Sequence, residues 1–361
     1  MLDLATRLRR QADQCGRMGS PLTAALLHGA ARDLVSGGVV AQVLAGEEGR
    51  PSGDVPALRL AGALHRFVLQ GRAPGLASYY PSVGGTSAPE AVWSAAEPTL
   101  REHLPELREQ VRRPLQTNEV GRSAVLYGAL MVLTARFGLP IRLLEVGASA
   151  GLNLRPDAYA YEVREGLVLG DQTSRVRISL PWAGTYPREG RPLVVQRAGC
   201  DLLPIDPTSA EGRLALTSYV WADQLDRLRR LRAALELASL QPLVVEATGA
   251  SAFLARELAA TRPGVLTVVW QSVVQQYLRP EERAAVGGLL RAAGASASPA
   301  TPLAWVAMEP AHVGRGGARF QVTATTWPDG TVETLAGCEG HGPPVIWRPR
   351  PDDNVEAWQG T

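Results

Sequence analysis

The sequence predicts an α/β protein with a mostly parallel sheet, an antiparallel hairpin at the C-terminal edge of that sheet, and an all-helical N-terminal domain in front of it. Before residue 115, apolar residues recur at helical spacing. After residue 140, five short apolar runs are separated mostly by helical segments, which is the pattern of a parallel sheet. We place a helical domain at 1–115, a sheet domain at 116–348 and a polar tail at 349–361.

Composition excludes several classes of protein. The chain has 361 residues, of which 45% are hydrophobic and 20% charged, as in ordinary globular proteins. Because the formal net charge is only +2, we expect no nucleic-acid partner. No apolar run approaches the roughly 20 residues of a membrane span, and the N-terminus lacks a signal-peptide core. We therefore expect a cytoplasmic protein that does not bind membranes.

The sequence contains no lysine, and this absence limits the possible chemistry. A Schiff base with pyridoxal phosphate, a Walker lysine and a lysine general base are all excluded. Cys15, Cys200 and Cys338 are far apart and form no Cys-x-x-Cys motif, so we expect buried thiols, with neither a disulfide scaffold nor a metal site.

The N-terminal domain is predicted from helix signals. Ser20-Pro21 supplies an N-cap and a first-turn proline for a helix that carries apolar residues from Leu22 to Leu34. Further amphipathic segments span 58–68 and 93–113. Between them, residues 71–89 are rich in glycine, proline and serine, and they form either a surface connection or a substrate loop.

A polar run, Gln116–Arg122, leads into a helix that stops at Gly138-Leu139-Pro140. Thr117 or Asn118 could cap this helix, and the charges could form a surface ion pair. Alternatively, the run supplies donors and acceptors to a ligand just before the next strand. We favour ligand contacts, with Asn118 and Arg122 on a cofactor and Glu119 on the substrate.

The stretch Ile141–Leu154 reads as a buried strand, a turn of small residues and then a helix, which Arg155-Pro156-Asp157 soon interrupts. A turn of this kind presents unpaired backbone amides at a helix start, which suits a nucleotide or another electron-rich group. The candidate cofactor contacts in the turn are Gly147, Ala148, Ser149, Gly151 and Asn153.

Three interpretations of this turn that do not involve a methyl donor remain open. A dinucleotide fingerprint requires Gly-x-Gly-x-x-Gly, and its second and third glycines are missing. A nucleophile elbow requires Gly-x-Ser-x-Gly, which matches with Ser149 as the nucleophile, although no earlier strands precede it. The turn could also bind no ligand at all.

The remaining elements follow in order along the chain. They are an inserted hairpin within 159–180, a strand at 192–197, a helix at 210–239, a strand at 243–247, a strand at 265–270, a helix at 279–293, a strand at 303–308, and a hairpin of 320–325 with 331–335 around Trp327-Pro328-Asp329-Gly330. The arginines of the helix at 210–239 fall largely off its leucine stripe and are predicted to be solvated.

Parallel strands place their carboxyl ends along one rim, where open α/β sheets bind ligands. Further cofactor contacts are predicted there at Asp201, Leu202, Glu246 and Gln271, and a substrate contact at Ser272. Asp201 suits ribose hydroxyls because a carboxylate accepts two donors at once. Candidate general bases are Glu309, His341, Tyr277 and His312, each of which could equally be structural.

A set of short motifs resembles the bacterial family called domain of unknown function 2332, and it covers essentially the whole chain. These motifs are Ser20-Pro21, Leu64-His65-Arg66, Gln116–Glu119, Glu145–Leu154, Gly199-Cys200-Asp201, Ser272-Val273-Val274, Met308-Glu309-Pro310 and His341-Gly342. That resemblance implies no activity, so it supports the fold more than a reaction.

A more remote resemblance is to class I methyltransferases. Glu145, two residues before Gly147, stands where their S-adenosylmethionine turn carries its acid, whereas Ser149 replaces the usual middle glycine. This likeness implies a Rossmann-like class I methyltransferase sheet, with S-adenosylmethionine as cofactor. The working hypothesis is an S-adenosylmethionine-dependent methyltransferase acting on a small molecule, with the helical domain as a lid or substrate wall.

The rival hypothesis is a non-catalytic S-adenosylmethionine-binding or regulatory protein on the same scaffold. Trp270-Gln271-Ser272-Val273 stands where amino methyltransferases of nucleobases carry Asp/Asn-Pro-Pro-Tyr, which argues against that substrate class. The sequence identifies neither the acceptor nor the oligomeric state.

Overall fold

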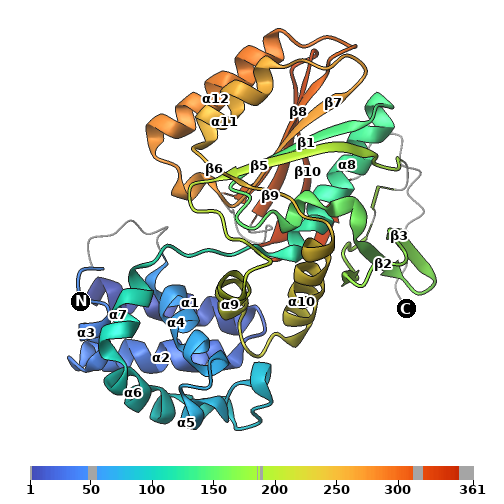
Figure 1. Ribbon diagram of the computed structural model, residues 1–361. Helices are drawn as coiled ribbons and strands as arrows, with labels where there is room; N and C mark the ends of the chain where they lie inside the picture. Colours follow the sequence, from blue (N-terminus) through green and yellow to red (C-terminus); the bar gives the residue numbers. More distant parts are fainter. Residues whose placement is uncertain (1, 48–54, 185, 188–189, 312–319, 349–361) are drawn as a thin grey trace. The chain divides into compact units, whose positions relative to one another are not determined.

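The structure is a computed structural model (Figure 1). It describes residues 2–47, 55–184, 186–187, 190–311 and 320–348. The chain divides into two compact units. The helical unit comprises the chain up to Thr117 together with Asp206–Arg232, and the sheet unit comprises Asn118–Ile205 together with the chain from Ala233 onward. A segment from the middle of the chain therefore belongs with the N-terminal helices.

The helical unit is built around one apolar core, to which residues such as Leu8, Leu27, Phe67 and Leu100 contribute. Its elements are α1 (Leu2–Arg17), α2 (Pro21–Val35), α3 (Val39–Val43), α4 (Pro56–Leu69), α5 (Pro74–Ala77), η2 (Pro81–Val83), η3 (Pro89–Ala91), α6 (Val92–Glu102), α7 (Leu104–Arg112), α9 (Ala210–Ser218) and the start of α10 (Leu225–Leu240). The predicted N-cap of α2 is confirmed, since the Ser20 side chain accepts a hydrogen bond from the Thr23 amide.

In the sheet unit, the described residues form an eight-stranded sheet in the order β11-β10-β9-β8-β7-β1-β5-β6. The strands are β1 (Ile141–Val146), β5 (Val194–Asp201), β6 (Glu246–Ala247), β7 (Leu266–Ser272), β8 (Leu303–Pro310), β9 (Phe320–Trp327), β10 (Thr331–Glu339) and β11 (Gly342–Trp347). Strands β6, β5, β1, β7 and β8 are parallel, and β9 to β11 continue the sheet antiparallel. The α/β class and the mostly parallel sheet are thereby confirmed.

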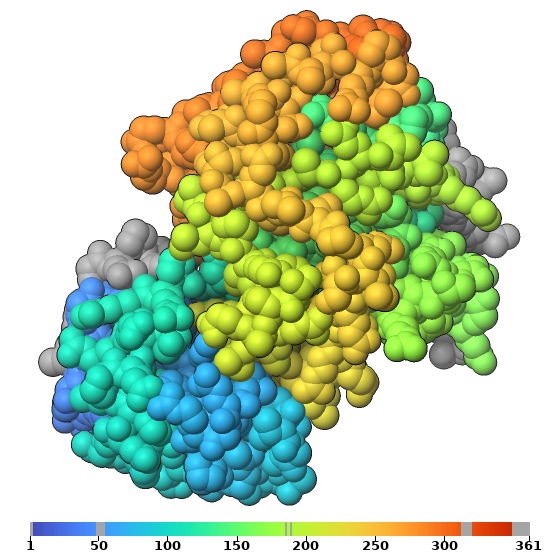
Figure 2. All heavy atoms as spheres, viewed as in Figure 1, coloured from blue at the N-terminus to red at the C-terminus, as the bar shows by residue number. Residues whose placement is uncertain are grey.

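Strand β1 lies in the middle of the sheet, between β7 and β5, and all six of its residues are buried. A strand covered on both faces is expected to read as a nearly continuous apolar run. On one face, Leu144 and Val146 pack with residues of α11 (Ala250–Ala259) and α12 (Pro280–Ala295). These two helices also pack on each other and lie side by side in Figure 1, and their atoms lie within the gold and orange region of Figure 2. Helix α8 (Ser123–Phe137) packs against β8 and β11.

The connection from β1 to β5 corrects the prediction that a helix follows the first strand. In the described residues, this connection contains only the 3-10 turns η5 (Leu152–Leu154) and η6 (Pro156–Ala158) before a separate small sheet. The residue preceding a proline is disfavoured in the α conformation, so Pro156 explains why no helix grows from the turn.

The small sheet confirms the hairpin predicted within 159–180. Strands β2 (Ala160–Arg164) and β3 (Leu167–Gly170) pair antiparallel, and β4 (Arg177–Ser179) adds a parallel partner to β2. The helix predicted over 210–239 is in fact two helices, α9 and α10, separated by residues 219–224.

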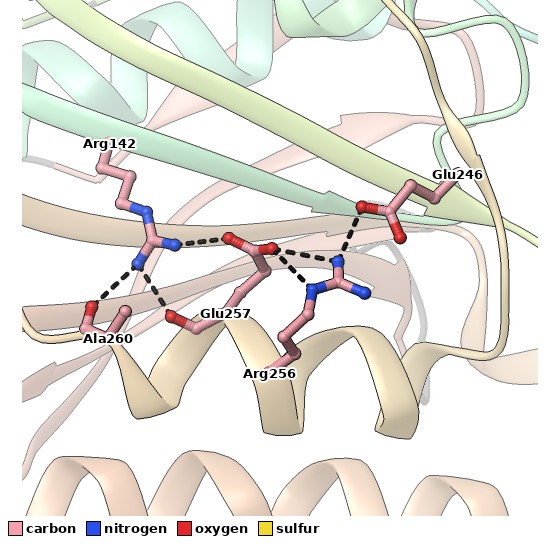
Figure 3. A network of polar contacts seen from close by, with 5 residues as sticks. All are labelled: Arg142, Glu246, Arg256, Glu257 and Ala260. Carbon is pink, nitrogen blue, oxygen red and sulfur yellow. Dashed lines mark hydrogen bonds and ion pairs between the residues drawn. The ribbon is translucent and has the colours of Figure 1, made fainter.

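A buried charge on β1 connects the sheet to α11 (Figure 3). Arg142 is 2% exposed, and its guanidinium donates to the backbone carbonyls of Glu257 at 2.9 Å and Ala260 at 3.3 Å. It also pairs with the Glu257 carboxylate. Carbonyls at the C-terminal end of a helix favour a cation, so Arg142 satisfies groups that the helix itself leaves unpaired.

We predict that Arg142→Met lowers the free energy of unfolding by about 3 kcal/mol, because it leaves the carboxylate and two carbonyls without their partner. The measurement is urea denaturation followed by circular dichroism. Arg256→Met is the matched control, since Arg256 also contacts Glu257 but is largely exposed, and it should cost much less. Equal losses in the two variants would contradict the structural role given to Arg142.

Candidate functional site

The candidate site is the rim formed by the carboxyl ends of the parallel strands. Numbered in chain order, the five parallel strands lie as 3-2-1-4-5, so the chain leaves β1 to one side and later returns to the other side with β7. In doubly wound sheets, ligands bind outside the carboxyl ends at this switch point. The switch point here lies between the ends of β1 and β7.

The turn after β1 has an unusual backbone. Gly147, Ser149 and Gly151 all have positive φ, at 71°, 52° and 67°. A Cβ at Gly147 would meet the Val274 side chain at 2.6 Å, so this position requires glycine for both conformation and space. Ser149 adopts the left-handed conformation without being glycine, a strain that is common at functional sites.

The amides of this turn are largely satisfied by the protein itself, which corrects the prediction that they are unpaired. The amides of Gly147 and Ala148 both donate to the Cys200 carbonyl at 2.9 Å. The Ser149 amide donates to the Asp201 carboxylate at 3.0 Å, and the Leu152 amide to the Asn118 side chain at 2.8 Å. The amides of Gly147, Ala148 and Ser149 therefore form no phosphate cradle, and they are not the free donors that were expected to contact a cofactor, whether a dinucleotide or S-adenosylmethionine.

Asp201 is the last residue of β5 and holds two backbone amides. One carboxylate oxygen accepts from Ser149, and the other accepts from Leu203 at 2.9 Å. An ionised carboxylate has about four acceptor sites, so two remain for a ligand. The neighbouring Leu202, predicted to contact a cofactor, is 73% exposed.

Glu145 is the most unusual ionisable group of the rim. It is 1% exposed and lies on the face of β1 opposite to Leu144 and Val146. Burial raises the pKa of its carboxyl well above the usual value, and the nearby Arg122 lowers it only in part. Its Oε2 has no hydrogen-bond partner within the described residues. The indole N–H of Trp270 is close enough to Glu145 to lower the same pKa, but it does not meet the geometry of a hydrogen bond to the carboxyl group.

A buried carboxylate oxygen without a partner is costly and calls for an explanation, such as a bound group that the protein alone does not supply. The neighbouring residues do not provide one among the contacts described. Glu145 is therefore the strongest single indication of a ligand at this rim.

Glu309, near the end of β8, holds the segment that follows β7. Its Oε1 accepts from the Gln271 side chain at 2.9 Å and from the amides of Val274 and Gln275 at 3.1 and 3.3 Å. Burial raises its pKa, and its Oε2 has no partner within the described part of the chain. In the same segment, Val273 has a φ of 57°, which is rare for a β-branched residue.

Arg122 joins three segments at one corner of the rim. Its guanidinium donates to the carbonyl of Gly340 at 3.0 Å and to that of Ser272 at 3.2 Å. His341 lies in the turn between β10 and β11, and its carbonyl lies close to Gly121. The structure thus places Arg122, Ser272 and His341 together.

Other candidates have structural partners. The Glu119 side chain accepts from the Gly121 amide at 3.0 Å and caps η4 (Val120–Arg122). The Asn153 side chain accepts from the Ser123 hydroxyl at 2.7 Å. Glu246 pairs with Arg256 at 2.6 Å (Figure 3), so its carboxylate already has a cation.

Two further candidate bases are Tyr277 and His312. Tyr277, in η7 (Gln275–Tyr277), is 48% exposed. His312 lies outside the described residues. Val274 and Trp270 are site neighbours that no sequence motif predicted. The pairing of β7 with β1 brings Trp270 beside Glu145, and Val274, two residues after β7, lies against Gly147.

Residues 5–347 match the model of a bacterial family described as "uncharacterized protein conserved in bacteria", DUF2332. The chain belongs to this family. The family resemblance of the sequence motifs is therefore confirmed over nearly the whole chain. No curated protein and no solved structure matches the chain.

Two further properties of this DUF2332 member concern the described residues. They contain no cluster of three or more histidine, cysteine or acidic side chains arranged to hold a metal ion. None of their helices combines the length and the apolar character that crossing a membrane demands.

We predict that Glu145→Gln stabilises the unliganded protein as pH rises. Because the pKa of Glu145 is raised in the folded state, wild-type stability is fully present below the unfolded carboxyl pKa and is lost as pH rises through the folded pKa. A neutral amide avoids that loss. Urea denaturation from pH 4 to pH 8 should give an advantage for the variant that grows with pH. The matched control is Glu281→Gln on the exposed surface of α12, and a similar trend there would contradict the prediction.

Proposed function

We propose that this chain is an S-adenosylmethionine-dependent transferase, most simply a methyltransferase, that acts on a small molecule. The observation that carries the proposal is the buried Glu145 carboxylate with an unpaired oxygen beside the switch point. A cationic ammonium or sulfonium group of the cofactor would supply the missing partner.

The strand arrangement supports the same proposal. Parallel strands in the order 3-2-1-4-5 followed by antiparallel strands are similar to the class I methyltransferase sheet, with the acid of the cofactor turn on the first strand. The sequence predicted one antiparallel hairpin, which corresponds to β9 and β10. A third antiparallel strand, β11, pairs with β10 at the edge of the sheet.

The charge of the rim favours a cationic ligand over a phosphorylated one. Three carboxylates, those of Glu145, Asp201 and Glu309, lie at the ends of β1, β5 and β8. The turn amides that would hold a phosphate already donate to Cys200 and Asp201. Asp201 keeps acceptor sites for ribose hydroxyls, so the donor set fits an adenosyl sulfonium.

When bound, the cofactor would supply an electrophilic methyl group, and the protein would have to orient the acceptor and take its proton. Glu309 suits the second task, because its raised pKa makes it a stronger base and its Oε2 has no partner within the described residues. His341 is a second candidate for that task. Ser272 would contact the acceptor from the end of β7.

Cofactor access requires the segment after β7 to move. Val274 lies against Gly147, where the ligand is expected, and Glu309 holds this segment through two backbone amides. Its strained residue, Val273, would relax when the segment withdraws, which would partly offset the lost hydrogen bonds.

We predict that isothermal calorimetry detects binding of both S-adenosylmethionine and its demethylated product. Glu145→Gln and Asp201→Asn should each weaken binding about tenfold or more, as expected for the loss of a charge-assisted hydrogen bond. Glu281→Gln should bind like the wild type. Absence of both heat and thermal shift with either compound would contradict the cofactor assignment. Binding without methyl transfer to any amine or hydroxyl acceptor would instead favour the non-catalytic alternative.

A further inference from the structure

Glu145 lies in the middle of the sheet, at a position where the neighbouring strands supply no positive charge. Its register partners are Trp270 on β7 and Gly199 on β5. Side chains at paired positions of neighbouring strands project from the same face, so Glu145 has an indole on one side and a residue without a side chain on the other. The carboxyl group is therefore buried beside groups that cannot neutralise its charge.

Two arginines lie near enough to Glu145 to favour its charge, but both donate to backbone carbonyls. Arg122 holds two carbonyls at the corner of the rim. Arg155 is buried and donates to the carbonyl oxygens of Gly151 at 2.7 Å and Gln241 at 2.6 Å. Within the described residues, neither arginine donates a hydrogen bond to Oε2 of Glu145.

The other ionisable groups around Glu145 do not favour its charge. Asp201 is itself an acid and raises the pKa of Glu145. Burial raises the pKa of the Tyr159 hydroxyl, and it raises the pKa of the Cys200 thiol to about 12, so both groups are neutral at pH 7. Burial of Glu145 outweighs the two arginines, and the neutral form of its carboxyl group is the less costly one to bury.

We propose that Glu145 is protonated in the unliganded protein and exchanges its proton for the cationic group of the ligand. This inference rests on the proposed function, and it adds a linkage between ligand binding and pH. As the cation takes its place beside Oε2, the carboxyl group releases one proton to solvent and becomes a carboxylate. The net charge at this position is zero before the exchange and zero after it, so no unpaired charge is buried at either stage.

The exchange distinguishes charged from neutral ligand groups. A sulfonium that has lost its methyl group is a neutral thioether, so a carboxylate facing that sulfur would regain its proton and hold the product less tightly. A carboxylate facing the amino group of the ligand would treat the methyl donor and its demethylated product alike. Proton release with each compound therefore identifies the group that Glu145 faces.

The first test needs no ligand. Infrared difference spectra between wild type and Glu145→Gln at pH 6.5 should contain the carbonyl stretch of a protonated carboxyl group, which is distinct from the carboxylate bands. The difference between wild type and Glu281→Gln, an exposed glutamate of α12, should lack this stretch. If the stretch is also missing from the Glu145→Gln difference, Glu145 is ionised without a ligand and the proposal is overturned.

The second test is calorimetry with S-adenosylmethionine in two buffers of different ionisation enthalpy at pH 6.5. There the α-amino group of the ligand, with a pKa of about 8, stays charged. Wild type and Glu281→Gln should release about one proton on binding, and Glu145→Gln should release none. From pH 5.5 to pH 6.5 the dissociation constant should fall by up to about tenfold in wild type and stay nearly constant in Glu145→Gln.

The outcomes separate this proposal from the proposed function. Proton release with S-adenosylmethionine alone assigns Glu145 to the sulfonium, and release with the demethylated product as well assigns it to the amino group. Binding without proton release, or with the same release in Glu145→Gln, overturns the exchange and leaves the cofactor assignment intact. If neither compound binds, the cofactor assignment fails and the exchange fails with it.

Discussion

The sheet unit depends on how strand β1 accommodates two buried charges on opposite faces. Arg142 is matched within the protein by the carboxylate and carbonyls of α11, so it fixes that helix to the sheet. Glu145, three residues later, keeps one oxygen without a partner in the described residues. Both terminal nitrogens of Arg142 are bonded and its charge has the Glu257 carboxylate as partner, although its Nε has no hydrogen bond within the described residues. A buried charge with an ionic partner is a structural element, whereas a buried carboxyl oxygen without a partner reduces stability unless another group joins it. This difference between two residues of one strand is the reason why we regard Arg142 as structural and Glu145 as the functional candidate.

The turn that follows β1 shows why the sequence predicted the place of the site better than its chemistry. Small residues at Gly147, Ser149 and Gly151 indicated a sharp turn, and the turn is present. Their spacing could not reveal that Cys200 and Asp201, on the neighbouring strand, accept hydrogen bonds from the amides. Such cross-strand pairing depends on register, which a local motif does not encode. For the same reason, the sequence did not predict that Glu309 accepts hydrogen bonds from the segment after β7.

Elements with a strong local signal were predicted closely, and elements at the sheet edges were not. Strands β1, β7 and β8 read as continuous apolar runs because both of their faces are covered. At one edge, only Glu246–Ala247 of the predicted strand at 243–247 pairs with β5. At the other edge, β11 was missed, because Pro343 and Pro344 argue against a strand, although an edge strand tolerates prolines. Edge pairing is decided by tertiary contacts, so local propensity is a weak guide there.

Desolvation shifts the pKa values of two buried groups, His65 and Glu145, in opposite directions. At His65, burial lowers the pKa to about 4, so the ring stays neutral between the Ser82 hydroxyl and the Ser218 carbonyl. At Glu145, burial disfavours the charged carboxylate, and only a cationic partner would make ionisation favourable. A buried neutral ring needs only hydrogen-bonding partners, whereas a buried carboxyl group becomes ionised only where positive charge or donors compensate for the lost water. His65 therefore has its partners within the protein and is a structural group of the helical unit, and among these two residues only Glu145 supports the proposed cation-binding role.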